Sequence, residues 1–100
     1  MKNYEISNAN YVLSQLIDEP LKGKFKFKVF NVKAELEKKL EVISKALEGV
    51  ENEAEREEIH QEEQEVNIDK FTEEELGQID LSIRQLAMLK PIIEFEKENE

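Results

Sequence analysis

The clearest pattern in the chain is a stripe of apolar side chains in its middle. Its members follow one another at spacings of three and four residues: Val29, Val32, Leu36, Leu40, Ile43, Leu47 and Val50. Such spacings place the side chains along one side of an α-helix and leave the opposite side polar. The pattern therefore predicts a long central helix over residues 29–48.

Gly49 sets the C-terminal end of this helix. Glycine inside a helix costs about 1 kcal/mol relative to alanine, whereas it suits a left-handed C-terminal cap. We therefore expect the helix to end near Leu47–Glu48 and a second helix to cover residues 52–64, so that the two form a hairpin. A single bent helix over residues 29–64 is the alternative, and the pattern leaves both open.

A first helix is predicted near the N-terminus, over residues 7–18. Ser7 or Asn8 can cap it, because their side-chain oxygens accept the free N–H groups of the first turn. Pro20 ends the run, since the residue before a proline avoids helical geometry. The apolar residues of this segment stand at helical spacing: Val12, Leu13, Leu16 and Ile17.

Two capping boxes predict helices in the C-terminal third. Thr72 with Glu75 opens a short helix that ends at Gly77, and Ser82 opens a last helix that Pro91 kinks or stops. The core is expected where the outer helices meet the central one: Leu36, Leu40, Ile43 and Leu47 against Leu13, Leu16, Ile17, Leu86 and Leu89.

Residues 24–29 fit two structures. Lysines alternate there with apolar residues, as in a strand, but the end of the segment also begins the helical stripe. Both interpretations stay open, and a short strand or extended segment over residues 24–28 is favoured. Residues 66–69 alternate as well, and they could pair with residues 24–29 in a short two-stranded ribbon.

Composition limits the class of protein. One hundred residues predict a single helical domain over residues 1–100, with an acidic tail at 95–100 that should fray. The absence of cysteine excludes disulfides, zinc–thiolate sites and a cysteine nucleophile. No apolar run approaches the roughly 20 residues that span a bilayer. Residues 1–5 lack the apolar core of a signal peptide, so we expect none there. We expect a cytoplasmic, mainly α-helical protein built on the central helix or hairpin.

Charge is distributed unevenly along the chain. The formal net charge is -10, yet residues 1–50 hold nine lysines and seven acids, and residues 51–100 hold five bases and seventeen acids. Glutamates four residues apart repel one another in the helix predicted over residues 52–64, which therefore needs a cationic surface. The lysines of residues 22–39 are the local candidate. A chain at this net charge is not expected to bind nucleic acid directly.

The candidate partner-binding residues are glutamates of the acidic stretch and lysines of the alternating segment: Glu53, Glu57, Glu58, Glu62, Glu63, Lys24, Lys26 and Lys28. A row of carboxylates can dock onto a basic protein, including as a mimic of phosphates. Lysines interleaved with Phe25 and Phe27 can meet phosphates while the rings stack on bases. The favoured alternative places both rings in the core and the lysines in solvent.

Residues for chemistry are few. His60 is the single histidine, and a metal site would combine it with Glu57 and with Glu53 or Glu63. Di-iron bundles need two such units and further carboxylates, so a solvated histidine is the favoured interpretation. The serines and threonines lack a histidine-based pattern, and the three glycines form no phosphate loop. We expect no catalytic residue, no metal and no cofactor.

Several short segments also occur in a familiar order. They are Leu21–Phe27, Asn31, Leu36, Leu40, Glu65–Asp69, Ile79–Ser82, Leu86, Leu89 and Ile92. This order resembles that of a group of small proteins from phages and prophages of Gram-positive bacteria. In those proteins a longer loop follows the long helix, whereas here it is nearly absent. The resemblance implies a phage origin and hence the host-cell cytoplasm, and it carries over no activity and no functional residue.

These observations favour a non-enzymatic protein that binds another protein. A phage-encoded acidic inhibitor or adaptor acting on a host nuclease or other defence protein is the leading hypothesis. One alternative is an oligomeric phage structural or assembly component that associates through the stripe over residues 29–50, whose length also allows a homodimer. The other alternative is a helical protein that binds a metal through carboxylates and His60.

Overall fold

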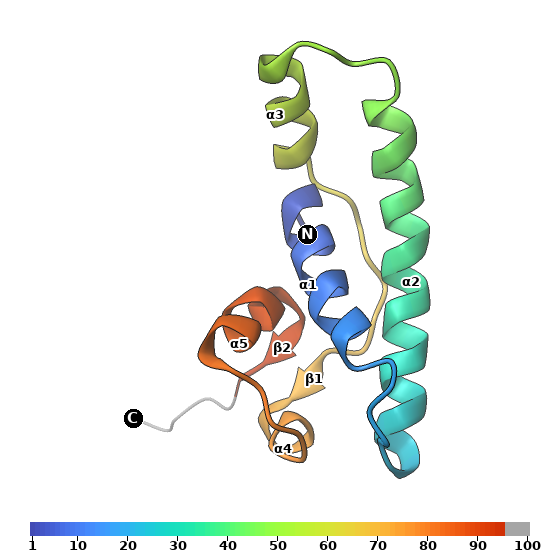
Figure 1. Ribbon diagram of the computed structural model, residues 1–100, viewed down its shortest axis with the longest axis vertical. Helices are drawn as coiled ribbons and strands as arrows, with labels where there is room; N and C mark the ends of the chain where they lie inside the picture. The colour runs from blue at the N-terminus through green and yellow to red at the C-terminus, as the bar shows by residue number, and fades with distance from the viewer. Residues whose placement is uncertain (96–100) are drawn as a thin grey trace.

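The computed structural model describes residues 1–95, most of which are helical. In chain order the elements are α1 (Asn3–Gln15), α2 (Gly23–Leu47), α3 (Glu53–Gln61), β1 (Phe71–Thr72), α4 (Glu73–Leu76), α5 (Ile83–Leu89), the 3₁₀ turn η1 (Lys90–Ile92) and β2 (Ile93–Glu94). α2 runs along the longest dimension, with α3 and α1 one after the other beside it, and α5 packs against α1 (Figure 1). The predicted class, mainly α-helical with a helical hairpin and a short two-stranded sheet, is confirmed.

α2 begins at Gly23, before the predicted start at Val29. Phe25 lies four residues before Val29, so it extends the buried stripe by one helical turn. Its ring packs edge-on against Phe71, with centroids 5.9 Å apart. Gly23 has a φ of 58°, which lets the chain turn from the preceding loop into the helix. The strand or extended segment predicted over residues 24–28 is therefore wrong, because burial of Phe25 prevails over the local alternation.

α1 also begins earlier than predicted, at Asn3. Ile6 is fully buried and continues the apolar side of this helix toward the N-terminus. The Oε1 atom of Glu5 accepts a hydrogen bond of 2.8 Å from the Lys2 N–H at the start of the helix. Ser7 and Asn8 therefore lie inside the helix and do not cap it, which corrects that prediction.

The predicted hairpin at Gly49 is confirmed. α2 ends at Leu47, Gly49 has a φ of 74°, and the chain turns into α3. The Asn52 side chain caps α3 by accepting hydrogen bonds from the N–H groups of Ala54 and Glu55 at 2.7 and 3.2 Å. The alternative of one bent helix is wrong, because the left-handed glycine and this cap separate two helices.

Both predicted capping boxes are present. The hydroxyls of Thr72 and Ser82 each accept a hydrogen bond of 3.1 Å from the N–H three residues later, and they open α4 and α5. α4 ends before Gly77, and α5 passes into the 3₁₀ turn that contains Pro91. These elements follow local capping rules and therefore match the sequence closely.

The small sheet differs from the predicted ribbon. β1 and β2 pair in parallel, with Phe71 opposite Ile93. Residues 24–29 are helical, and residues 66–69 carry no strand, so the predicted pairing of these two segments is wrong. The expectation of a frayed tail over 95–100 falls mainly on residues 96–100, which lie outside the described residues.

The core surrounds α1, which contacts both α2 and α5. Most residues expected there are buried or half-buried: Leu13, Leu16, Leu36, Leu40, Ile43, Leu47 and Leu89. Ile17 and Leu86 are corrections, since 63% and 39% of their surfaces are exposed. Ile17 follows the end of α1, where helical spacing no longer applies, and α5 buries Leu89 instead of Leu86.

Replacing Leu36 by alanine should lower the free energy of unfolding by about 2–5 kcal/mol, because truncation of a fully buried leucine leaves a cavity. Val42 lies on the outer side of the same helix with 54% of its surface exposed. The Val42→Ala control should change stability by less than about 0.5 kcal/mol. Urea denaturation measures both variants, and equal losses would contradict this assignment of the two sides of α2.

Candidate functional site

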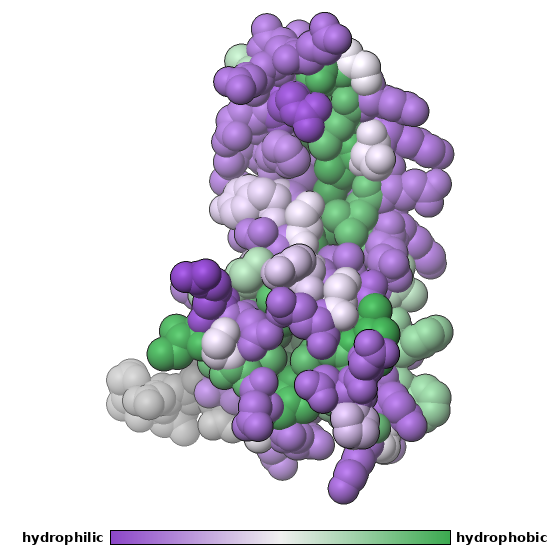
Figure 2. Space-filling model, viewed as in Figure 1, coloured by the Kyte–Doolittle hydropathy of each residue, from purple (hydrophilic) through white to green (hydrophobic). Residues whose placement is uncertain are grey.

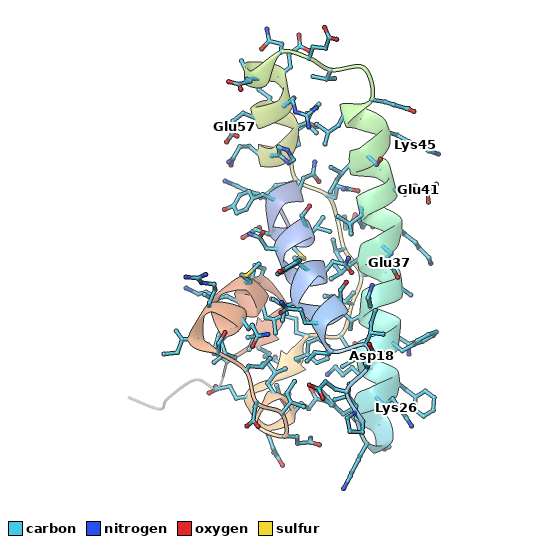
Figure 3. The ribbon with its side chains drawn as sticks, in the orientation of Figure 1. Asp18, Lys26, Glu37, Glu41, Lys45 and Glu57 are labelled. Carbon is cyan, nitrogen blue, oxygen red and sulfur yellow. The ribbon has the colours of Figure 1, made fainter. Side chains whose placement is uncertain are left out.

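The predicted glutamates gather on and just after α3. Glu53, Glu57 and Glu58 belong to the helix, Glu62 and Glu63 follow it, and all five are exposed. We call these five residues the acidic row. Glu57 lies on the outer side of α3, away from α2, and its Oε1 accepts a hydrogen bond of 3.1 Å from Gln61 (Figure 3). No ion pair within residues 1–95 includes a member of the acidic row.

The predicted lysines lie at the other end of the molecule. Lys24, Lys26 and Lys28 belong to the first turns of α2, whereas α3 lies beside its C-terminal part (Figure 1). Four lysines farther along α2 pair with glutamates of the same helix: Lys33, Lys38, Lys39 and Lys45. No lysine of residues 22–39 forms an ion pair with the acidic row within residues 1–95, so the expectation that these lysines neutralise the acidic helix is wrong.

The three predicted lysines do not form one surface. Lys24 and Lys28 line an open cavity of about 540 Å³ together with Phe27. Lys26 lines a separate groove, and its Nζ lies 5.8 Å from the centre of the Phe27 ring. Phe25 is buried as expected, but Phe27 is 64% exposed, since helical geometry turns the two rings to different sides of α2.

Lys28 has a structural role. Its Nζ donates hydrogen bonds to the Lys70 carbonyl at 2.7 Å and to Glu75 Oε1 at 2.8 Å, so it ties α2 to the start of α4. Burial alone would raise the pKa of Glu75, but hydrogen bonds from Lys28 and from the Thr72 N–H, with the charge of Lys28, lower it below its ordinary value of 4.5. Lys28 is thus occupied within the chain.

A polar network that the sequence did not predict positions the acidic row. Asn3 is buried, and its Nδ2 donates to the Ile59 carbonyl in α3 at 2.6 Å. Gln64 Nε2 donates to Asn3 Oδ1 at 2.8 Å and to the Lys39 carbonyl in α2 at 3.1 Å. This Asn3–Gln64 network therefore joins α1, α2 and α3.

Main-chain hydrogen bonds reinforce the network. The Asn3 N–H donates to the Glu62 carbonyl at 2.8 Å, and the Gln64 N–H donates to the Met1 carbonyl at 2.8 Å. These bonds use the backbone of residues 62–64, so α3 ends at Gln61 and not at residue 64 as predicted. Asn3 lies three residues before Ile6, on the buried side of α1. Its burial could have been predicted from this spacing only if the start of the helix had been known.

His60 is half-buried beside an open pocket that Tyr4 and Ser7 also line. Glu57 lines the same pocket, but Glu53 and Glu63 do not. Among residues 1–95, no three histidine, cysteine or acidic side chains come close enough to hold a metal ion. The combination of residues considered for a metal site is therefore not brought together in this part of the chain.

Comparisons of the chain with protein-family models, with curated proteins and with solved structures find no match. Within residues 1–95, no helix has the length and apolar character needed to cross a bilayer. What the protein can do is therefore inferred from its own surfaces. Two of these differ sharply in character: the carboxylates of the acidic row, which form no ion pair within residues 1–95, and the apolar groove along the first half of α2.

The Lys28→Met variant should raise the pKa of Glu75, because it removes both a hydrogen-bond donor and a positive charge. The pKa of Glu75 is lower in the folded chain than in the unfolded chain. As the pH falls, the unfolded chain therefore takes up a proton at Glu75 before the folded chain does. The stabilisation from Glu75 is thus complete above pH 4.5 and is lost as the pH falls through the folded pKa. Carboxyl NMR titration measures the shift, with Lys24→Met as the control. An unchanged Glu75 pKa in Lys28→Met would contradict the pairing.

The Gln64→Ala variant should selectively loosen α3. It removes two side-chain hydrogen bonds that hold the end of α3 against α1 and α2, while the apolar core is untouched. We expect faster amide hydrogen exchange over residues 53–61 and little change in the middle of α2. Gln78→Ala, at an exposed glutamine, is the matched control. Uniform acceleration in all helices would instead assign Gln64 a role in global stability.

Proposed function

We propose that the chain is a non-enzymatic protein-interaction protein whose acidic row docks onto a basic surface of a partner protein. One observation carries this proposal: the acidic row is exposed, and no lysine or arginine within residues 1–95 forms an ion pair with it. Arg56, the one lysine or arginine in α3, donates to the Val50 carbonyl instead.

The energetics of α3 support this proposal. Glu53 with Glu57, and Glu58 with Glu62, repel each other at a spacing of four residues. The helix contains no fully buried residue, and Ile59 is its half-buried apolar contact. Because the fold keeps this repulsion and no lysine or arginine within residues 1–95 forms an ion pair with the acidic row, a basic partner surface would relieve it.

The resemblance to phage proteins supports a host protein as the partner. We propose an inhibitor or adaptor that acts on a host defence protein, with a nuclease as the leading class. Nuclease surfaces that hold nucleic acid are lined by lysine and arginine, which contact the phosphates. A row of glutamates on a fixed helix has the negative charge needed to bind such a surface. Binding alone would block the nuclease, so this chain would need to catalyse no reaction.

The test is capture of host proteins on the tagged chain, followed by titration with the partner obtained. We expect a stoichiometric partner with a basic surface, whose affinity falls as salt is added because screening weakens the contact. Glu57→Lys combined with Glu58→Lys should lower the affinity by roughly tenfold or more, since it places like charges against the basic surface.

Asp69→Lys combined with Asp80→Lys is the matched control. Both aspartates are exposed, they lie outside α3, and the pair changes the net charge by the same amount. This variant should retain binding to within a few-fold, because distant charges are screened. Binding that survives the reversal in α3, or that is lost equally in the control, would contradict the acidic row as the contact.

A further inference from the structure

A small cavity joins the acidic row to α1. The end of α3 lies beside the start of α1 (Figure 1), and an open cavity of about 410 Å³ lies between the two helices. Each helix lines it with three residues at the same spacing, one residue and those three and four positions later: Tyr4, Ser7 and Asn8 from α1, and Glu57, His60 and Gln61 from α3. Because this spacing places side chains on one side of a helix, two matching helix faces build the cavity.

The carboxylate in this cavity is held in place. Gln61 Nε2 donates a hydrogen bond of 3.1 Å to Glu57 Oε1, one turn earlier in α3. Gln61 Oε1 accepts a hydrogen bond of 3.3 Å from the Nζ of Lys2, a residue that does not line the cavity. The Asn3–Gln64 network holds α3 itself against α1. A ligand that pairs with Glu57 therefore has little ordering of this side chain to offset.

The charge of the cavity has one sign. Among residues 1–95, Glu57 is the one charged residue that lines it at pH 7, with His60 counted as neutral. The three side chains from α1 add hydroxyl and amide oxygens, which are hydrogen-bond acceptors. Hydrophilic side chains cover α3 on the face shown in Figure 2, and the formal net charge of the chain is -10. The surroundings of the cavity thus attract cations.

Tyr4 brings an aromatic ring to the cavity, and 40% of its surface is exposed. Cations are attracted to the faces of aromatic rings. An arginine guanidinium is planar and weakly hydrated, so it stacks on a ring while its parallel N–H groups bind a carboxylate. A lysine ammonium is a compact charge that holds its water more strongly. A tyrosine and a carboxylate around one cavity therefore favour arginine over lysine.

We propose that this cavity binds an arginine side chain of the basic partner. The guanidinium pairs with Glu57 and stacks on the ring of Tyr4. The inference deepens the proposed function and rests on it for the source of the arginine, which is a protein surface. The other glutamates of the acidic row supply attraction at a distance, whereas the cavity anchors one residue and distinguishes arginine from lysine.

A small probe tests the cavity without the partner. The probe is a tripeptide with arginine between two glycines, blocked at both ends so that it carries one positive charge. In an NMR titration of the full chain, we expect amide shifts to change at residues 4–8 and 57–61 and to saturate with a Kd on the order of millimolar. The same tripeptide with lysine should bind roughly threefold more weakly, or worse.

Matched variants test the two contacts. Glu57→Gln and Tyr4→Leu should each weaken binding of the arginine tripeptide by roughly threefold or more. Glu58→Gln and Tyr11→Leu are the controls, because these residues are exposed on the same two helices and do not line the cavity. The controls should leave the affinity nearly unchanged.

Three results would overturn the arginine site. They are shifts that do not saturate up to roughly 0.1 M tripeptide, equal affinity for the arginine and lysine tripeptides, and equal effects of the variants and their controls.

Further outcomes separate this inference from the proposed function. If the arginine tripeptide binds in the cavity but no basic partner is captured, the cavity stands and the proposed function is overturned. If a captured partner depends on the acidic row but is weakened equally by Glu57→Gln and Glu58→Gln, the cavity is overturned as the anchor and the acidic row remains the contact.

Discussion

The Asn3–Gln64 network is the interaction on which the placement of α3, and with it the acidic row, depends. A buried amide is costly without partners, and here Asn3 satisfies both its donor and its acceptor by joining α1 to α3 and to Gln64. Gln64 extends the connection to the backbone of α2. α3 has no fully buried side chain of its own, so polar contacts hold it in place where an apolar stripe holds α1 and α2 together.

The surfaces of α2 and α3 differ in how their charges are paired. α2 neutralises much of its own charge through pairs one turn apart, such as Lys33 with Glu37 and Lys45 with Glu41. α3 carries its carboxylates without such partners. The apolar groove beside Phe30 lies toward the opposite end of α2 from the acidic row.

Local rules explain what the sequence could predict. The stripe in α2, the left-handed Gly49 and the capping boxes at Thr72 and Ser82 are all encoded within a few residues. Features that depend on distant partners were missed. Phe25 is helical because Phe71 packs on it, and Phe71 in turn sits in a strand that pairs with Ile93. The exposure of the acidic row was predictable from its composition, but its separation from the lysines follows from the direction of the hairpin.

The central claim is that the carboxylates of α3 repel one another and are not neutralised by the lysines of the same chain. The most direct measurement is the urea concentration at the midpoint of unfolding, determined in sodium chloride from about 0.01 M to about 0.15 M. Over this range the screening length falls from about 30 Å to about 8 Å. Unscreened repulsion predicts that the midpoint rises with salt, and rises less in the Glu57→Lys, Glu58→Lys variant. A midpoint that falls with salt would mean that attractive pairs dominate, and it would contradict the account.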